Sequence, residues 1–384
     1  MTDKQSKMIH HLPVEAYTSK EWFDKEQELI FSKTWFFAGF VEDIKEPGDF
    51  VSVQAGLNNI FIIKGHDGQL RAFHNICRHR GTQLLRAAGN GGKAITCPYH
   101  DWTYNFKGDL VGVPEHKDEF ADIDKKCHGL KTASVGIWRS MLFVHPDPDA
   151  ISVEEWFAPV ESHLGPHKVE DLVEYPNTST RHEIKANWKV VVENYIDVYH
   201  LAHLHSGTLS MYDHKSAKFG FYGPHYAFKE PLKDVYAQDI KKNAPYPLVV
   251  PEDSLGAWVP MLFPGFGLAE SECTWSIFHI IPISPDLSVV ETRTRMKDAS
   301  YWEFGKQASK SAGFWKGRIR GKYAKGLSDD DPMASGDFMA EDVYACEQQQ
   351  ASFKSPNFDV GPAAKNGEQP ILDHQKVVLK WLGK

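Results

Sequence analysis

The stretch CRHRGTQLLRAAGNGGKAITCPYHDWTY, residues 77–104, holds two cysteines and two histidines in two close pairs. One residue separates Cys77 from His79, and two residues separate Cys97 from His100. Two thiolates and two imidazoles can bind zinc, or they can hold a [2Fe–2S] cluster with the cysteines on one iron and the histidines on the other. Zinc fingers usually group cysteine with cysteine and histidine with histidine. Because each pair here supplies one of each, the order favours the iron–sulfur cluster over zinc.

The totals describe a folded chain with room for two domains. It has 384 residues, of which 42% are hydrophobic, and domains usually contain about 100–200 residues. The net charge of -8 argues against nucleic acid or an anionic membrane as a partner. We find no apolar run of about 18 residues and no secretory signal in the polar start MTDKQSKMIHHLP. Five cysteines, an odd number, indicate reduced thiols, so we expect a cytoplasmic protein without a membrane span.

The pattern of apolar residues changes along the chain and predicts three segments. Residues 1–37 contain a helical repeat at 15–36, which we expect to pack on the C-terminal domain. Residues 38–155 consist of short β-branched and aromatic runs separated by Gly, Asp, Asn and Pro, which is typical of an all-β domain. Residues 156–384 mix both signals and predict an α+β domain with antiparallel strands. Within it we expect helices at 187–205, 301–325 and 333–353, and a last short helix after a loop.

A second group of chemical side chains lies in NWKVVVENYIDVYHLAHLH, residues 187–205. Positions three or four apart share a helix face, so Asp197 and His200 are predicted neighbours, and the carboxylate could orient a metal-bound imidazole. Helical periodicity would pair His200 with His203. A spacing of five would place His205 about 140° away around the helix.

Both groups resemble motifs of the Rieske non-haem iron oxygenases, in their catalytic (alpha) subunit. The first matches C-x-H-x17-C-x2-H. The second matches E-N-x-x-D-x-x-H-x4-H at Glu193, Asn194, Asp197, His200 and His205. The resemblance implies that His200 and His205 bind a mononuclear Fe(II), with His203 as the rival. It requires the helix to end, bend or bulge before residue 205, for example through a π-type turn.

Two histidines leave such an iron site one carboxylate short of the 2-His-1-carboxylate set. The family places this acid far downstream, in a helix like ASGDFMAEDVYACEQQQ, residues 334–350. Asp342 matches best. Asp337, Glu341 and Glu347 are nearby alternatives.

The resemblance also implies an architecture and a set of partners. It implies a Rieske domain that is all β, followed by a helix-grip-like catalytic domain, in a head-to-tail trimer. Oxygen is the co-substrate, and electrons come from a separate flavin-containing reductase, in some systems through a ferredoxin. In that trimer one subunit's cluster serves its neighbour's iron, with Asp197 bridging His200 of its own chain and His100 of the next. Asp197 and Asn194 are the residues predicted to take part in catalysis.

This chain departs from the family pattern in two places. Asp101 follows His100 where glycine is common, and HLHSG, residues 203–207, follows the iron motif where a proline often comes soon after. Both departures concern the local hydrogen bonding of the ligands. Neither removes a ligand.

The sequence gives fewer indications of the substrate. Members of the family hydroxylate aromatic rings or remove methyl groups from nitrogen or oxygen. We expect the binding pocket to use the aromatic residues that follow the iron motif, namely Tyr212, Phe219, Phe221, Tyr222, Tyr226 and Phe228. No arginine occurs between Arg181 and Arg293, which disfavours an aromatic acid. The prediction is hydroxylation of a small aromatic compound, with demethylation of a betaine-like quaternary ammonium compound as the alternative.

Two other classes of protein are compatible with part of the pattern. A Rieske electron carrier with an added binding domain would need no second iron site. A zinc-stabilised binding protein would have no redox role. Metal analysis would distinguish all three classes.

Overall fold

The computed structural model describes residues 10–175, 178–244, 246–298, 325–328 and 330–384. It divides the chain into two compact units. The small unit is Lys25–Ala158, and the large unit joins Met1–Asp24 to Pro159–Lys384. The chain therefore changes unit at residues 24/25 and 158/159, against the predicted limits of 37/38 and 155/156.

The N-terminal helical segment is shorter and more broken than predicted over residues 15–36. It consists of α1 (Glu15–Thr18), α2 (Lys20–Glu26) and a π-helical turn (Gln27–Phe31), and the first strand begins at Phe36. Ser19 is extended, with φ -86° and ψ 131°, and it ends α1. Phe36, the last residue of the predicted helix, is instead buried in this strand together with Phe37 and Phe40.

The small unit is built on antiparallel sheets, as predicted. Its larger sheet has the order β1-β10-β9-β4-β3-β2-β5, and the smaller one has the order β6-β7-β8. The strands are β1 (Phe36–Phe40), β2 (Asp49–Ala55), β3 (Asn58–Lys64), β4 (Leu70–His74), β5 (Ala88–Asn90), β6 (Ile95–Thr96), β7 (Thr103–Tyr104), β8 (Leu110–Gly112), β9 (Thr132–Trp138) and β10 (Met141–His145). A short helix, α3 (His116–Glu119), follows β8. The core between these strands includes Phe61, Phe73, Trp102 and both ligand cysteines, Cys77 and Cys97.

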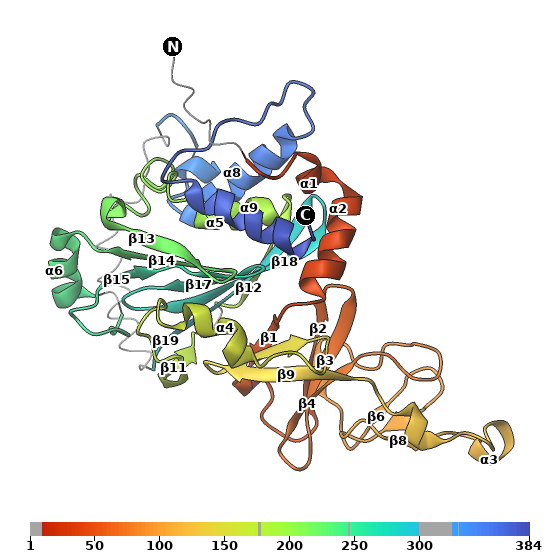
Figure 1. Ribbon diagram of the computed structural model, residues 1–384. Helices are drawn as coiled ribbons and strands as arrows, with labels where there is room; N and C mark the ends of the chain where they lie inside the picture. Colours follow the sequence, from red (N-terminus) through yellow and green to blue (C-terminus); the bar gives the residue numbers. More distant parts are fainter. Residues whose placement is uncertain (1–9, 176–177, 245, 299–324, 329) are drawn as a thin grey trace. The chain divides into compact units, whose positions relative to one another are not determined.

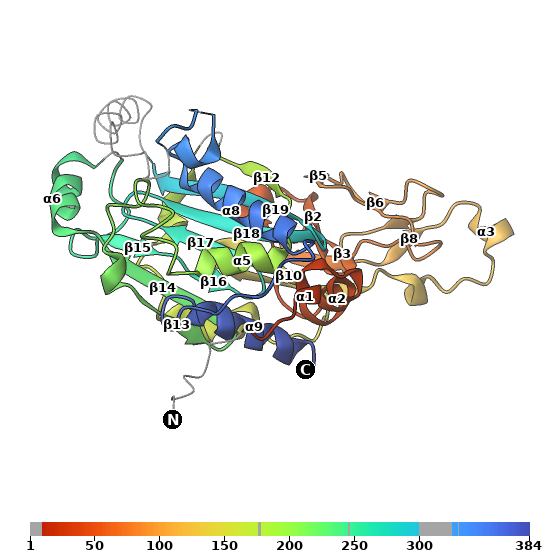
Figure 2. The same ribbon diagram turned by 90° about the horizontal axis from the view of Figure 1, so that it is seen from above.

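The large unit is one antiparallel sheet with helices on one face. The sheet runs β11-β19-β18-β17-β15-β14-β13, with β12 beside β19 and β16 beside β14 and β17. The strands are β11 (Leu172–Glu174), β12 (Thr180–Ile184), β13 (Lys218–Tyr222), β14 (His225–Pro231), β15 (Gly256–Trp258), β16 (Met261–Leu262), β17 (Phe266–Glu270), β18 (Trp275–Ser284) and β19 (Leu287–Lys297). The helices are α5 (Trp188–Ile196), α6 (Asp234–Asn243), α8 (Phe338–Ser352) and α9 (Gln369–Trp381), while α4 (Val153–Glu161) crosses the boundary between the units. Figures 1 and 2 show α5, α8 and α9 lying over the same face of this sheet.

Helix α5 is shorter than predicted, and its end determines the geometry of the second site. Asn187 caps its first turn by accepting a hydrogen bond from the backbone N–H of Lys189. The helix ends at Ile196, because Asp197 is extended, with φ -70° and ψ 119°, and its carboxylate accepts from the N–H of Tyr199. The predicted helix over 187–205 is therefore wrong beyond residue 196. The residues around His200 and His205 form turns, in place of the suggested π-type bulge.

The other predicted elements have mixed outcomes. Helix α8 (Phe338–Ser352) confirms a helix within the predicted range 333–353 but begins five residues later, and α9 confirms the last short helix. The helix predicted at 301–325 lies outside the described residues, apart from residue 325. Within the described part of the chain, no helix is long and apolar enough to cross a bilayer.

Candidate metal sites and cavity

The two Cys/His pairs of the small unit form two tight turns flanking the sheet β6-β7-β8. The N–H of Gly81 donates to the carbonyl of Cys77 at 3.0 Å, and the N–H of Asp101 donates to that of Cys97 at 3.1 Å. Both cysteine side chains are 2% exposed and form no disulfide. Burial, followed by the neighbouring Cys77 thiol, raises the pKa of Cys97.

The two histidines of these turns face each other and have nitrogen atoms free for ligation. The rings of His79 and His100 lie 4.7 Å apart, and the indole of Trp102 stacks on His79 with an interplanar angle of 9°. The Nδ1 atoms of both histidines are buried and have no hydrogen-bond partner. Burial, followed by the charge of His100, lowers the pKa of His79, which favours the neutral ring that a metal requires. Two buried thiols and two unpartnered imidazole nitrogens fit a [2Fe–2S] cluster.

Asp101, the first departure from the family pattern, has a backbone conformation that usually favours glycine. Its φ is +53°, in the left-handed region that glycine adopts most easily, and Gly81 at the corresponding point of the first turn has φ +78°. Aspartate tolerates this region better than most residues do. The turn is therefore kept without glycine, and the N–H of Asp101 still closes it.

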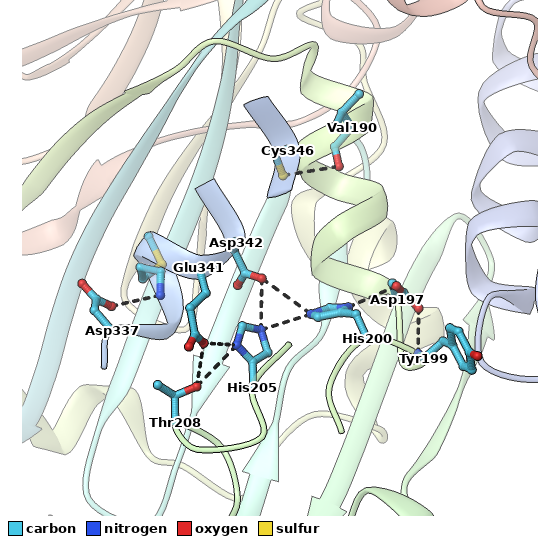
Figure 3. Close-up of polar contacts among 11 residues, drawn as sticks. Val190, Asp197, Tyr199, His200, His205, Thr208, Asp337, Glu341, Asp342 and Cys346 are labelled. Carbon is cyan, nitrogen blue, oxygen red and sulfur yellow. Dashed lines mark hydrogen bonds and ion pairs between the residues drawn. The ribbon is translucent and has the colours of Figure 1, made fainter. Parts of the chain in front are cut away.

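The structure brings His200, His205 and Asp342 together in the large unit (Figure 3). The two Nε2 atoms lie 3.2 Å apart, and Asp342 Oδ1 lies 3.0 Å from Nε2 of His205 and 3.6 Å from Nε2 of His200. Ligand atoms at about 2.1 Å from one ion, with angles of about 90–110°, would be separated by roughly 3.0–3.4 Å. Two of the three separations lie in this range and the third, 3.6 Å, is slightly longer, so the three donors can hold one divalent metal ion on one side, with further positions open.

The structure separates the alternative residues from these three donors. His203 is exposed, and its ring contacts Tyr199. Asp337 accepts from the N–H of Met339 and caps α8, while Glu347 accepts from the N–H of Lys185. Asn194 lines the cavity described below, but it is not among the grouped donors.

Each of the two histidines has a carboxylate beside its other ring nitrogen. Asp197 Oδ2 lies 3.1 Å from Nδ1 of His200, without the alignment of a hydrogen bond. Glu341 Oε2 lies 2.7 Å from Nδ1 of His205. Burial would lower the pKa of His205, but the hydrogen bonds to Asp342 and Glu341 outweigh it and raise the pKa to about 9. This surrounding negative charge favours a cation at the three donor atoms.

A cavity of about 990 Å³ opens onto the same three residues. Its wall follows the alternation of the sheet, because every second residue of a strand points to the same side. The alternating strand residues are Thr180, His182 and Ile184 on β12, Tyr226, Phe228 and Glu230 on β14, Ser276, Phe278 and Ile280 on β18, and Val290, Thr292 and Thr294 on β19, and the wall also includes Ala257 on β15 and Ala269 and Glu270 on β17. This part of the wall, on β12, β18 and β19, was not predicted, although the alternating hydroxyl side chains of Thr292 and Thr294 were a usable signal in the sequence.

Only half of the six aromatic residues predicted for the pocket line this cavity. Tyr212, Tyr226 and Phe228 do. Phe219, Phe221 and Tyr222 do not, because they lie on β13, the edge strand of the sheet. The Tyr226 side chain is 1% exposed, and its hydroxyl has no hydrogen-bond partner.

The charged residues of the wall are acidic. Among the described residues that line the cavity, the carboxylates are Asp197, Glu230, Glu270, Asp337 and Asp342, and there is no lysine or arginine. Glu230 pairs with Nδ1 of His214 at 2.7 Å, and Glu270 accepts from the indole N–H of Trp275. The wall therefore suits a neutral or cationic molecule better than an anion.

Comparison with known proteins gives matches over both units. Residues 34–133 match the Rieske [2Fe-2S] domain, and residues 170–384 match the ring hydroxylating alpha subunit (catalytic domain). The carnitine monooxygenase oxygenase subunit of Acinetobacter baumannii is 34% identical over 197 residues, which are 51% of this chain and 52% of that protein. The large oxygenase component of a naphthalene 1,2-dioxygenase system from Pseudomonas aeruginosa is 34% identical over 194 residues, 50% of this chain and 43% of that protein. The matched segments thus span about half the length of these relatives.

Solved structures extend the likeness of fold to nearly the whole chain. A quaternary ammonium Rieske monooxygenase, in a study of carnitine oxidation and inter-subunit electron transfer, superposes with a TM-score of 0.76 at 21% identity, covering 98% of this chain and 96% of that one. Naphthalene 1,2-dioxygenase with bound indole gives a TM-score of 0.70 at 20% identity over 97% and 92% of the two chains. Since the catalytic-domain match alone covers residues 170–384 of 384, the chain belongs to the family of ring-hydroxylating alpha subunits and carries a Rieske [2Fe-2S] domain before the catalytic domain.

Proposed function

We propose that the protein is the terminal oxygenase component of a Rieske oxygenase system, which uses O₂ and electrons from a separate NAD(P)H-dependent reductase to hydroxylate a small organic substrate. The observation that carries this proposal is the facing set of His200, His205 and Asp342 at the end of a cavity large enough for such a substrate. The same chain has the buried Cys/His turns of an electron relay.

The side chains have distinct parts in this proposal. Cys77, His79, Cys97 and His100 hold the cluster, and His200, His205 and Asp342 hold the mononuclear iron. When bound, the iron activates O₂ and the cluster supplies electrons one at a time. Asp197 holds His200 in position, and Asn194 borders the cavity close to the same turn. The apolar and hydroxyl side chains of the strands position the substrate and exclude water.

The partners are part of the same proposal. We place the protein in the cytoplasm as a homotrimer that receives electrons from a flavin-containing reductase, directly or through a ferredoxin. The five cysteines, all of them free, support a reducing compartment. Inter-subunit electron transfer in the quaternary ammonium monooxygenase supports a ring in which His100 of one subunit faces Asp197 of the next.

The lining of the cavity is compatible with two classes of substrate. Hydroxylation of a small aromatic compound is supported by the apolar wall around Phe228 and Phe278 and by the naphthalene and dinitrotoluene dioxygenase relatives. Oxidative demethylation of a quaternary ammonium compound is the second candidate. The acidic wall favours it, since a cation gains from both the carboxylates and the aromatic faces, and so do the carnitine and glycine betaine monooxygenase relatives.

The first test is metal content. We expect about three irons and two acid-labile sulfides per chain, because a [2Fe–2S] cluster and one mononuclear site require them. About two irons per chain would instead identify an electron carrier, and zinc without sulfide would identify a binding protein. Either result would overturn the proposal.

Turnover tests the substrate class. The protein, a generic reductase, NADH and O₂ are incubated with matched compounds: a neutral aromatic, its carboxylate, and a trimethylammonium compound. Product mass and formaldehyde release are measured, since demethylation releases formaldehyde and ring hydroxylation does not. We expect the carboxylate to be the poorest substrate of the set. Efficient turnover of that acid would contradict the inference that the acidic wall disfavours an anionic substrate.

A further inference from the structure

Glu341, the residue next to the proposed ligand Asp342, contacts the same imidazole as that ligand. Its Oε2 atom lies 2.7 Å from Nδ1 of His205, while Asp342 Oδ1 lies 3.0 Å from Nε2 of the same ring (Figure 3). Two consecutive residues in the first turns of α8 therefore hold opposite nitrogens of one histidine. The extra methylene of glutamate allows Glu341 to reach the far side of the ring.

The surroundings of Glu341 fix the position of its carboxylate. The side chains of Glu341 and His205 are each 1% exposed. Thr208 Oγ1 donates to the same Oε2 atom at 2.8 Å, which leaves that oxygen with two donors. Thr208 and His205 lie on the same turn of chain, so Glu341 links this turn to α8. A buried carboxylate with two short hydrogen bonds is held in one place.

The other proposed histidine ligand is held differently. Asp197 lies 3.1 Å from Nδ1 of His200 without hydrogen-bond alignment, and these two side chains are 14% and 16% exposed. The other carboxylate oxygen of Asp197 accepts a hydrogen bond from the backbone N–H of Tyr199. Within the described residues, His205 therefore has the tighter and more deeply buried carboxylate partner of the two.

From this geometry we propose that Glu341 is the positioning residue of His205. The hydrogen bond to Glu341 places a ring proton on Nδ1 and holds the ring with Nε2 directed at the metal position, so Nε2 is the nitrogen left for the metal. Carboxylate partners of this kind orient histidine ligands and strengthen metal binding, and their loss costs 10–100-fold in affinity. The inference rests on the proposed function, because it assumes that His205 binds the mononuclear iron.

The experiment measures Fe(II) affinity on the full-length protein with its cluster intact. The mononuclear iron is removed with a chelator under argon, and Fe(II) is titrated back in competition with a colorimetric chelator. We expect Glu341→Ala to bind Fe(II) about 100-fold more weakly than the wild type, and Glu341→Gln about tenfold more weakly. Glutamine keeps the acceptor oxygen and loses only the charge, so it should restore part of the affinity.

A matched control separates positioning from general stability. Glu347 lies on the same helix and accepts a hydrogen bond from the backbone N–H of Lys185, away from the three donors, so Glu347→Gln should keep wild-type affinity. The rhombicity of the Fe(II)–NO electron paramagnetic resonance signal provides a second readout. It should change in the Glu341 variants and stay unchanged in the control.

Each outcome has a defined meaning. If the alanine variant does not fold, the glutamine variant carries the test. A folded Glu341 variant whose affinity lies within twofold of the wild type would overturn the inference while leaving the proposed function intact. A wild-type protein that binds no third iron would overturn both.

Discussion

Asp197 serves two neighbours with its two carboxylate oxygens. Oδ1 accepts from the N–H of Tyr199 at 2.7 Å and ends α5, and Oδ2 lies 3.1 Å from Nδ1 of His200. One side chain thus contacts both the end of the helix and His200, the first of the two histidines proposed to bind iron. The two roles can be separated by substitution, since only the second depends on which group faces the imidazole.

Replacing Asp197 with asparagine should keep the helix end and damage the reaction. The amide oxygen of Asp197→Asn can still accept from Tyr199, but the amide N–H₂ would face a ring nitrogen that itself carries a proton. We expect product formation to fall about 100-fold or more, with the visible spectrum of the cluster unchanged. Product mass per unit time and absorbance are the measurements. A fully active variant would remove Asp197 from the mechanism.

At the scale of the element, α5 is held by a buried polar network on the side away from the cavity. The hydroxyl of Tyr17 donates to Glu193 Oε1 at 2.7 Å, and Gln375 Nε2 donates to the same oxygen at 3.2 Å. Lys189 is fully buried and donates to Asn187 Oδ1 at 2.8 Å. These bonds connect α1, α5 and α9 one turn before Asp197. They therefore hold in place the helix that leads into the turns with His200 and His205.

Burial raises the pKa of Glu193 to about 7, although the hydrogen bonds from Tyr17 and Gln375 and the charge of Lys189 lower it. In the unfolded chain a glutamate titrates near 4.3. Between these values the folded state binds more protons, so the contribution of Glu193 to the free energy of unfolding is present at low pH and is lost as pH rises to about 7. The loss amounts to at most about 4 kcal/mol.

Substitution isolates this effect from other buried groups. Burial lowers the pKa of His374 to about 3, which acts in the opposite direction as pH falls, so the wild-type profile alone is not diagnostic. Urea unfolding of the wild type and Glu193→Gln should be compared at several values from pH 5 to pH 8. We expect the variant to gain stability relative to the wild type as pH rises. If the stabilities of the two proteins changed in parallel with pH, the raised pKa of Glu193 would be contradicted. The control is Glu183→Gln, since Glu183 is an exposed carboxylate.

At the scale of the whole molecule, the small unit has everything needed to fold and to hold its cluster. Both of its sheets lie within Lys25–Ala158, and its core includes Cys77 and Cys97. Its first residues also belong to it, because the N–H of Leu57 donates to Ser32 Oγ at 3.0 Å. The four residues proposed to hold the cluster, Cys77, His79, Cys97 and His100, all lie within this unit.

We therefore expect a fragment of residues 25–158 to fold and incorporate the cluster. Its visible absorption and circular dichroism should match those of the full chain, because the cysteines are buried by residues of the same unit. Reconstitution of the purified fragment with iron and sulfide tests this. An insoluble or colourless fragment, obtained where the full chain reconstitutes, would show that the large unit is needed for the cluster.

Much of this protein follows from short spacings in its sequence. The alternation of strand residues and the turn residues predicted the sheets of both units, and the fold class is confirmed. The order of Cys77, His79, Cys97 and His100 favoured a cluster because each close pair supplies one cysteine and one histidine. Such local patterns are readable because backbone geometry relates near neighbours in a fixed way.

Only the tertiary structure decided what depends on distant residues. Periodicity favoured His203 over His205, but the end of α5 at Ile196 changes the direction of the chain and brings His205 to His200. Asp342 and Glu341 meet His205 across 137 and 136 residues, and no local spacing could show that both hold the same ring. The cavity wall likewise depends on which strands pair. The sequence by itself determined the types of candidate ligand and their order along the chain. Only the packing of helix α8 against the turns after α5 decided which of the candidate histidines and carboxylates lie together, because side chains far apart in sequence meet only in the folded chain.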